Sequence, residues 1–390
     1  MPLDMDTLYR RVEAMAVDLP DAISAQQLAE ARNFLQRADP QVLRRKLQQR
    51  TTKIPWLVAE PIHTLAGTYP VTALPEDWSV VAADGSTIPP DRHSPVRYYV
   101  LNIGHALLTY GAAPDALLWA QGHFFYEESE LYFDHLEKRI PIEGTRLGIR
   151  MGMDEIDGLL AAARCAAPPL VALRDGSLIF WDLQNEDQSI RDEYLRQLLE
   201  AMDAFRDAQI PVASYISYPG SHDVINSLRL MLCDRESADC ARCPQETGEQ
   251  VLCRFMGGLW DRDLYRGLLR PGDRSDIFAS QSAILERYRA HRIQFFYLDV
   301  EGEIARIEAP QWVLDDPSML ELVHSTVVDQ CRRSGQYPPY PPVLIEAHEQ
   351  AVISTADRQA VGELVEQALA DKGRFYLRSA KDRSKRSRGV

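Results

Sequence analysis

Leu170-Val171-Ala172-Leu173-Arg174-Asp175-Gly176-Ser177-Leu178 is the stretch of the chain that decides its fold class. The apolar run follows Pro168-Pro169 and ends in an acid, a glycine and a small hydroxyl. This pattern predicts a buried strand with a carboxylate at its C-terminal end, where the chain turns. The same design occurs earlier as Val80-Val81-Ala82-Ala83-Asp84-Gly85-Ser86. Adjacent carboxylates repel each other unless a cation lies between them, so the two stretches predict a divalent-metal site on a central sheet.

A plain structural interpretation of these two tripeptides stays open at this point. Asp-Gly is among the commonest turn dipeptides, and a single Asp-Gly-Ser after a strand is ordinarily a turn. Two such tripeptides, each behind an apolar strand, make the metal site and the simple turn comparable hypotheses.

Composition and charge bound the class of protein. The chain has 390 residues, of which 45% are hydrophobic and 26% charged, as expected for a globular protein with one large domain and additions, or with two domains. The net charge of −14 argues against a protein that coats nucleic acid, although an enzyme acting on nucleic acid remains compatible with it. Residues 1–20 carry acids and two adjacent arginines, and residues 159–173 are broken by Arg164 and two prolines. We therefore expect no signal peptide, no membrane span and a cytoplasmic location.

The order of predicted elements indicates an α/β fold. Residues 3–50 have helical spacing, and three strands from Asp84 onward have the tight connections of an antiparallel meander. The second half reads helix (145–163), strand, helix (187–205), strand, which favours a parallel pair. A meander followed by α/β units is the layout of a ribonuclease H-like mixed sheet flanked by helices. That analogy of topology does not by itself indicate a function.

Two further segments carry candidate ligands. Asp154-Glu155-Ile156-Asp157 lies in the helix before the Asp175 strand, and one of its acids, most simply Glu155, could reach the same edge of the sheet. Near the C-terminus, the prolines of residues 337–342 precede a helix expected from Val343, whose first turns carry His348. A helical acid is ordinarily solvated and a lone helical histidine is ordinarily a surface or core residue, so the spacing alone leaves both open.

Taken together, these segments resemble the motif regions of the NurA nuclease family. The resemblance rests on Asp84-Gly85-Ser86, on Asp175-Gly176-Ser177-Leu178 and on the Tyr-Pro…Leu-Ile-Glu-Ala-His segment ending at His348, in that order along residues 78–352. It implies a manganese-dependent nuclease with a ribonuclease H-like core that digests DNA ends 5′ to 3′ and also cuts single strands. It further implies a homodimer that works with a HerA-type translocase in processing double-strand breaks.

The resemblance also implies roles for individual residues. Asp84 and Asp175 match the metal-binding carboxylates, Glu155 the helical acid, His348 the metal-site histidine and Tyr340 a tyrosine near the site. Oxygen ligands with one imidazole suit Mg²⁺ or Mn²⁺, and the nitrogen favours Mn²⁺. The domain organisation that follows is an N-terminal helical extension (1–75), a nuclease domain (76–375) and a basic C-terminal tail (376–390).

A four-cysteine insertion at residues 233–253 departs from the archaeal type of the family. Cys233, Cys240, Cys243 and Cys253 have the spacing C-x6-C-x2-C-x9-C. In a cytoplasmic chain such a cluster favours a metal over disulfides. The alternatives are a structural Zn²⁺, an iron–sulfur cluster and no metal.

Arg270 and Arg274 are candidate contacts to a DNA phosphate. They flank the turn before a helix expected from Ile277, and backbone amides at a helix start can bind phosphate. A plain N-cap by Ser275 or Asp276 explains the same residues.

Two other function classes compete with the nuclease. An actin-like ATPase or sugar kinase also places acids and glycines after strands, but it needs a late Gly-Gly motif, and the late pair here, Gly257-Gly258, lies beside the cysteines. A catalytically inactive adaptor of a DNA translocase would keep the fold without its acids, whereas all the candidate acids are present.

Overall fold

The chain divides into two compact units, each described here by itself. A computed structural model describes residues 3–18, 24–49, 54–92, 94, 96–135, 138–235, 238–240, 243 and 252–374. The first unit comprises residues 1–60, 64–66 and 220–264, and the second comprises 61–63, 67–219 and 265–390. The four cysteines thus lie in the same unit as the N-terminal helices. The basic tail expected at residues 376–390 lies outside the described residues.

The first unit is mainly helical. A small core of Leu43, Val58, Leu230 and Ala238 holds it together. Buried Asp261 accepts hydrogen bonds from the amides of Val224 and Ile225. It therefore caps the first turn of the helix that contains these two residues, α7 (Asp223–Leu232). The elements of the unit are α1 (Met5–Asp18), α2 (Ala25–Arg37), α3 (Pro40–Gln48), α7 (Asp223–Leu232), the short helix η3 (Leu252–Met256) and α8 (Asp261–Tyr265), whose last residue belongs to the second unit.

The second unit is built on a mixed sheet, as the sequence predicts. The strand order is β11-β12-β13-β9-β8-β3-β4-β5, and β10 pairs with both β12 and β2. The pairs β3–β8 and β8–β9 are parallel, and β3, β4 and β5 form the predicted antiparallel meander. The strands are β2 (Thr68–Tyr69), β3 (Trp78–Ile88), β4 (Tyr99–Tyr110), β5 (Asp115–Phe125), β8 (Leu170–Asp175), β9 (Val212–Ile216), β10 (Arg274–Ser275), β11 (Phe278–Ser280), β12 (Ile293–Asp299) and β13 (Ile304–Pro310), with β1 (Ala59–Pro61) shared between the units.

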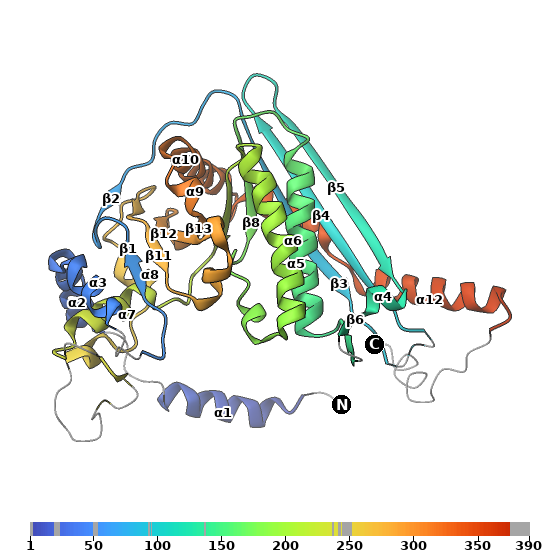
Figure 1. Ribbon diagram of the computed structural model, residues 1–390, viewed down its shortest axis with the longest axis horizontal. Coiled ribbons are helices and arrows are strands. Elements are labelled where there is room, and N and C mark those ends of the chain that lie inside the picture. The colour runs from blue at the N-terminus through green and yellow to red at the C-terminus, as the bar shows by residue number, and fades with distance from the viewer. Residues whose placement is uncertain are drawn as a thin grey trace. The chain divides into compact units, whose positions relative to one another are not determined.

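Helices cover both faces of this sheet. Figure 1 shows α5 and α6 side by side over β3, β4 and β8. On the other face, α11 packs on β3 and β4, next to α10. The helices and short elements are α4 (Glu128–Leu131), α5 (Thr145–Ala163), α6 (Gln188–Asp207), α9 (Gln311–Leu314), α10 (Pro317–Arg333), α11 (Pro342–Ala351), α12 (Thr355–Asp371), the hairpin β6 (Tyr132–His135) with β7 (Lys138–Pro141), and the 3₁₀ turns η1 (Trp181–Asn185), η4 (Ala283–Arg287) and η5 (Arg289–His291).

Alternation along the strands assigns each side chain to one of two cores. Val81 and Ala83 of β3 pack with α5 and α6, whereas Val80 and Ala82 pack with α10 and α11. In β8, Ala172 belongs to the first core and Val171 to the second. Because successive side chains of a strand point to opposite faces, this parity also fixes the direction of the polar residues that follow.

One expectation about the strands is wrong in a way that matters for the site. β8 ends at Asp175, and Gly176 follows with φ +79°, which is the predicted turn. β3, however, does not end at Asp84 but continues through Gly85 and Ser86 to Ile88. The reason is that its antiparallel pairing with β4 persists to the last residue of the strand, where Ile88 pairs with Val100.

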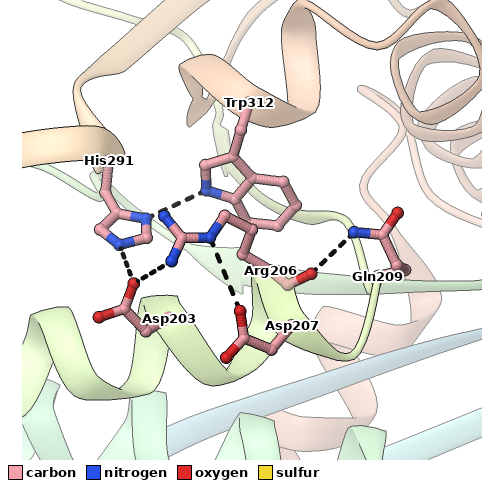
Figure 2. Close-up of polar contacts among 6 residues, drawn as sticks. All are labelled: Asp203, Arg206, Asp207, Gln209, His291 and Trp312. Atoms are coloured by element: carbon pink, nitrogen blue, oxygen red, sulfur yellow. Dashed lines mark hydrogen bonds and ion pairs between the residues drawn. The ribbon is translucent and has the colours of Figure 1, made fainter.

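Buried histidines hold several of these elements together. Figure 2 shows Trp312 of α9 donating from Nε1 to Nδ1 of His291 in η5 (3.1 Å), while His291 Nε2 donates to Asp203 of α6 (3.0 Å). His324 of α10 is 2% exposed, and its Nε2 donates to the carbonyl of Gly272 (2.8 Å). Burial favours the neutral form of both side chains, because it lowers the pKa of His291 and lowers that of His324 to about 4.

We expect the buried His324 to make the fold acid-sensitive. Its pKa is lower in the folded than in the unfolded chain, so its contribution to stability is complete above the unfolded pKa of about 6.5 and is lost as the pH falls from there toward 4. This predicts a loss of about 2 kcal/mol from this group between pH 7 and pH 5. Urea unfolding at both pH values should show a smaller loss in His324→Gln than in the wild type. His63→Gln, at an exposed position, is the control, and an unchanged pH dependence in His324→Gln would contradict the prediction.

Candidate active site

The site begins with two aspartates on neighbouring parallel strands. Ala83 of β3 is in register with Arg174 of β8, so the next residues, Asp84 and Asp175, lie side by side. Asp84 has the same parity as Val80 and Ala82, and Asp175 the same parity as Val171 and Leu173, so both carboxylates point to the face that α11 covers. The predicted pairing of the two acids is therefore present, at the level where β8 ends.

His348 reaches Asp84 from α11. The helix begins at Pro342, a residue whose fixed φ and missing amide suit the first turn of a helix. Asp84 Oδ2 accepts a hydrogen bond from His348 Nδ1 at 2.7 Å. With the proton on Nδ1, the other ring nitrogen, Nε2, carries the lone pair that could bind a ligand.

Tyr340 meets the second aspartate. It lies close enough to Asp175 to be influenced by the charge of that carboxylate, and its ring packs edge-on against Tyr215, with centroids 5.2 Å apart. Burial raises the pKa of Tyr340, and the charge of Asp175 raises it further. Tyr340 is therefore a phenol that lies beside Asp175.

Glu155 approaches the same place from the opposite face, on α5. It is 6% exposed, and a Cβ added at Gly85 would lie 2.8 Å from Glu155 Oε1, so the missing side chain of Gly85 is what lets this carboxylate lie beside β3. Burial raises the pKa of Glu155; the Arg174 guanidinium opposes this rise, and the charges of Asp84 and Asp175 add to it. Glu155 is therefore close enough to Asp84 and Asp175 to be influenced by their charges.

The neighbouring acids of α5 point elsewhere. Asp154 pairs with Arg150 at 3.0 Å, and Asp157 accepts from Gln197 at 2.7 Å. Of the three acids that the sequence left open, the structure brings Glu155 to Asp84 and Asp175.

The donor set suits a divalent metal, but its donors are turned toward protein partners. Three carboxylates and an imidazole are ligands of the Mg²⁺ and Mn²⁺ type. Within the described residues, no three His, Cys, Asp or Glu side chains are arranged as a ready metal-binding group. Two of these carboxylates already have protein partners, because Asp84 is bonded to His348 and Glu155 to Arg174. Binding a metal would require some of these hydrogen bonds to be exchanged for metal–oxygen bonds.

Gly104 sets how closely α11 approaches the sheet. It pairs directly with Asp84 in the β3–β4 ladder. A Cβ at this position would lie 2.3 Å from both Ala347 O and Ala351 N, which are backbone atoms of α11. Asn102 of the same strand donates to the carbonyl of Ala351 at the end of the helix (2.9 Å). β4 thus fixes the position of α11, and with it that of His348.

We expect Gly104→Ala to destabilise the fold by about 1–3 kcal/mol, because backbone atoms cannot rotate away from the added methyl group. Gly148→Ala in α5 is the matched control: no atom lies within 4 Å of its added Cβ, and alanine favours a helix over glycine by about 1 kcal/mol. The free energy of unfolding in urea measures both changes. Equal stability of Gly104→Ala and the wild type would contradict the close packing of α11.

The four cysteines are near one another without forming a metal-binding group. Burial raises the pKa of the Cys240 thiol, and the charges of Cys233, Cys253 and Cys243 raise it further. All four are free thiols of intermediate exposure. In the part of the chain that the structure describes, they are not arranged as ligands of one ion.

The helix expected from Ile277 is wrong. Arg274 lies in β10, and the chain continues into β11 at Phe278. The Arg274 guanidinium lies 4.2 Å from the ring centroid of Tyr69 and donates to the carbonyl of Ser275 (3.0 Å), so it is part of the fold. The phosphate-binding hypothesis for Arg270 and Arg274 therefore loses the helix start on which it depended, as does the N-cap alternative at Ser275 or Asp276.

Sequence reasoning missed one residue that contacts the site. Arg174 pairs with Glu155 through Nη2 at 2.8 Å, with the two side chains 12% and 7% exposed. A signal was present in the sequence, because Arg174 is a charged residue at the end of an otherwise apolar strand.

The fold and the site define a ribonuclease H-like α/β protein with a cluster of acids where neighbouring parallel strands meet two helices. A family model described as the NurA domain matches residues 79–353, which is most of the chain. The chain therefore belongs to the NurA domain family.

A solved structure agrees with this fold. The NurA nuclease from Sulfolobus solfataricus is similar with a TM-score of 0.50 at 11% identity, covering 94% of this chain and 99% of that one. LC9-RNase H1, a type 1 RNase H with the type 2 active-site motif, shows a weaker likeness, with a TM-score of 0.23 at 14% identity, covering 41% of this chain and 72% of that one. No curated protein sequence matches the chain. Within its described part, no helix has the length and apolar character needed to cross a bilayer.

Proposed function

We propose that this protein is a divalent-metal-dependent DNA nuclease. The observation that carries the proposal is the convergence of Asp84, Asp175 and Glu155 from three elements, with His348 on Asp84. A fold alone would not support a reaction, but a group of like charges, of which Glu155 is buried and Asp175 is exposed, in a family with a nuclease member supports a phosphodiester hydrolase.

Each residue has a role in this proposal. Asp84, Asp175, Glu155 and His348 would hold Mn²⁺ or Mg²⁺, which when bound would activate water and neutralise charge on the phosphodiester. Tyr340, which lies beside Asp175, would orient that carboxylate. His348 is 64% exposed, so it can also meet a substrate that approaches from solvent.

The finer activity follows from the family resemblance. We propose that the protein digests DNA ends 5′ to 3′ and cuts single strands, that it acts as a homodimer in the cytoplasm, and that it works with a HerA-type translocase in resecting double-strand breaks. The adaptor alternative is less favoured. Burial of Glu155 close to two other acids is energetically unfavourable, and a fold without a metal site would gain no function from keeping it. No contact of the described residues favours the ATPase alternative.

We expect the purified protein to cleave a 5′-labelled single-stranded oligonucleotide with Mn²⁺ or Mg²⁺ but not with EDTA. Asp175→Asn and Glu155→Gln should each lower the rate by at least about 100-fold, because a metal contributes several kcal/mol to the transition state. Asp157→Asn is the matched control on the same helix, since its partner is Gln197 and it should retain activity. Gel analysis of the products, with circular dichroism of each variant, measures the effect.

The outcomes separate the competing functions. Loss of the fold in Asp175→Asn would make the acid structural rather than catalytic. Absence of products under every condition, also with a HerA-type translocase added, would contradict the nuclease and favour the adaptor.

We further propose that Cys233, Cys240, Cys243 and Cys253 hold a structural Zn²⁺ or an iron–sulfur cluster. Their spacing and common neighbourhood support this. Because metals bind thiolates, the binding would release protons and draw the four side chains together.

Elemental analysis of the purified protein should find about one Zn²⁺ per chain, or iron with visible absorption for a cluster. Cys240→Ser/Cys243→Ser should lose this metal, whereas Cys165→Ser, at an exposed cysteine outside the group, should keep it. Equal metal content in the wild type and the double variant would contradict the site.

A further inference from the structure

We propose that Arg174 is a positioning residue that orients Glu155 toward a divalent cation; this inference rests on the proposed function. Arg174 has the parity of Ala172, which places its side chain on the α5 face of the sheet, opposite Asp175. On that face its Nη2 donates to Glu155 Oε2 at 2.8 Å. The arginine and the aspartate beside it thus serve the same site from the two faces of the sheet.

The guanidinium is itself held in place by groups other than Glu155. Its Nη1 donates to the carbonyl of Ser177 at 2.6 Å, and its central carbon lies 5.2 Å from the ring centroid of Phe180. A Cβ at Gly152 of α5 would lie 3.4 Å from Nη2 and 2.7 Å from the Phe180 ring, so the glycine leaves room for this arrangement. The position of Arg174 is therefore fixed independently of Glu155, and Glu155 binds to this fixed guanidinium.

The support continues one step further into the core. Ser177 Oγ and the Leu178 amide both donate to Glu308 Oε2, at 2.7 and 3.0 Å. Glu308 is 1% exposed, and its other oxygen accepts from Arg306, which is 4% exposed. A buried ion pair thus fixes the loop whose carbonyl holds Arg174. Such a pair is costly unless fully hydrogen-bonded, so it suits a fixed support better than a movable one.

In this arrangement the two carboxylate oxygens of Glu155 have different neighbours. Oε2 is bonded to Arg174, while Oε1 is the oxygen that approaches Gly85, next to Asp84. Arg174 also supplies the positive charge that a buried carboxylate close to two other acids requires. The result is a Glu155 with one oxygen held by Arg174 and the other beside Gly85 of β3, before any metal binds.

The test is calorimetric titration of the metal-free, full-length protein with MnCl₂. Residues that orient a metal ligand typically change metal affinity by about 10–100-fold, and we expect a loss of that size in Arg174→Met. Arg174→Lys should recover part of it, because lysine restores the charge but not the forked hydrogen bonding. Arg146→Met is the matched control, since Arg146 lies on the same helix as Glu155 and pairs with Glu186 (2.8 Å) instead.

A second readout separates positioning from folding. In cleavage assays, Arg174→Met should need more Mn²⁺ for half-maximal rate while the KM for DNA at saturating Mn²⁺ stays that of the wild type. Thermal melting of each metal-free variant reports the fold, and if Arg174→Met does not fold, Arg174→Lys carries the test with an expected loss of a few-fold in Mn²⁺ affinity.

The outcomes are distinguishable from failure of the proposed function. Mn²⁺ affinity in Arg174→Met equal to or above that of the wild type would overturn the positioning role, and a higher affinity would mean that the guanidinium competes with the metal. Wild-type protein that binds no Mn²⁺, or whose affinity is unchanged by Asp175→Asn, would overturn the metal site itself and this inference with it.

Discussion

The adjacency of Asp84 and Asp175 is the constraint around which the second unit is built. Parallel pairing of β3 with β8 places the two carboxylates next to each other, and Glu155 adds a third acid from across the sheet. In a partly buried place such a group is unfavourable unless donors or a cation compensate for it. The structure supplies donors from both faces: His348 on one and Arg174 on the other.

Two glycines make this convergence sterically feasible. Gly85 removes the side chain that would collide with Glu155, and Gly104 removes the one that would collide with the backbone of α11. Both lie in strands, where glycine weakens the intrinsic preference for extended structure. The loss of strand stability at these glycines is offset by helix packing on the two faces of the sheet. The glycines thus allow the helices to approach the sheet closely. The site therefore depends on the space left by Gly85 and Gly104 as well as on its polar side chains.

The charged groups of the site are more exposed to solvent than those of the network that supports it. Arg306 and Glu308 form a nearly inaccessible pair whose hydrogen bonds hold the loop after Asp175. His348, by contrast, is 64% exposed, and its partner Asp84 is 22% exposed. A rigid, satisfied network beneath a partly exposed group of acids is the arrangement expected of a site that exchanges its hydrogen bonds for a ligand.

The sequence by itself determined the two strands that carry Asp84 and Asp175, the pairing of these acids and the family, because apolar periodicity and ordered motifs are local signals. It also predicted the helices of the second half, where spacing and prolines fix the boundaries. It failed at Ile277, since Gly272 to Asp276 reads like a helix start while the segment pairs as strands with β12. It could not choose among the acids of α5, nor foresee that β3 continues past Asp84. Only the tertiary structure decided these points, because pairing with β4, helix packing at Gly85 and the contact of Arg174 with Glu155 all depend on residues far apart in the chain.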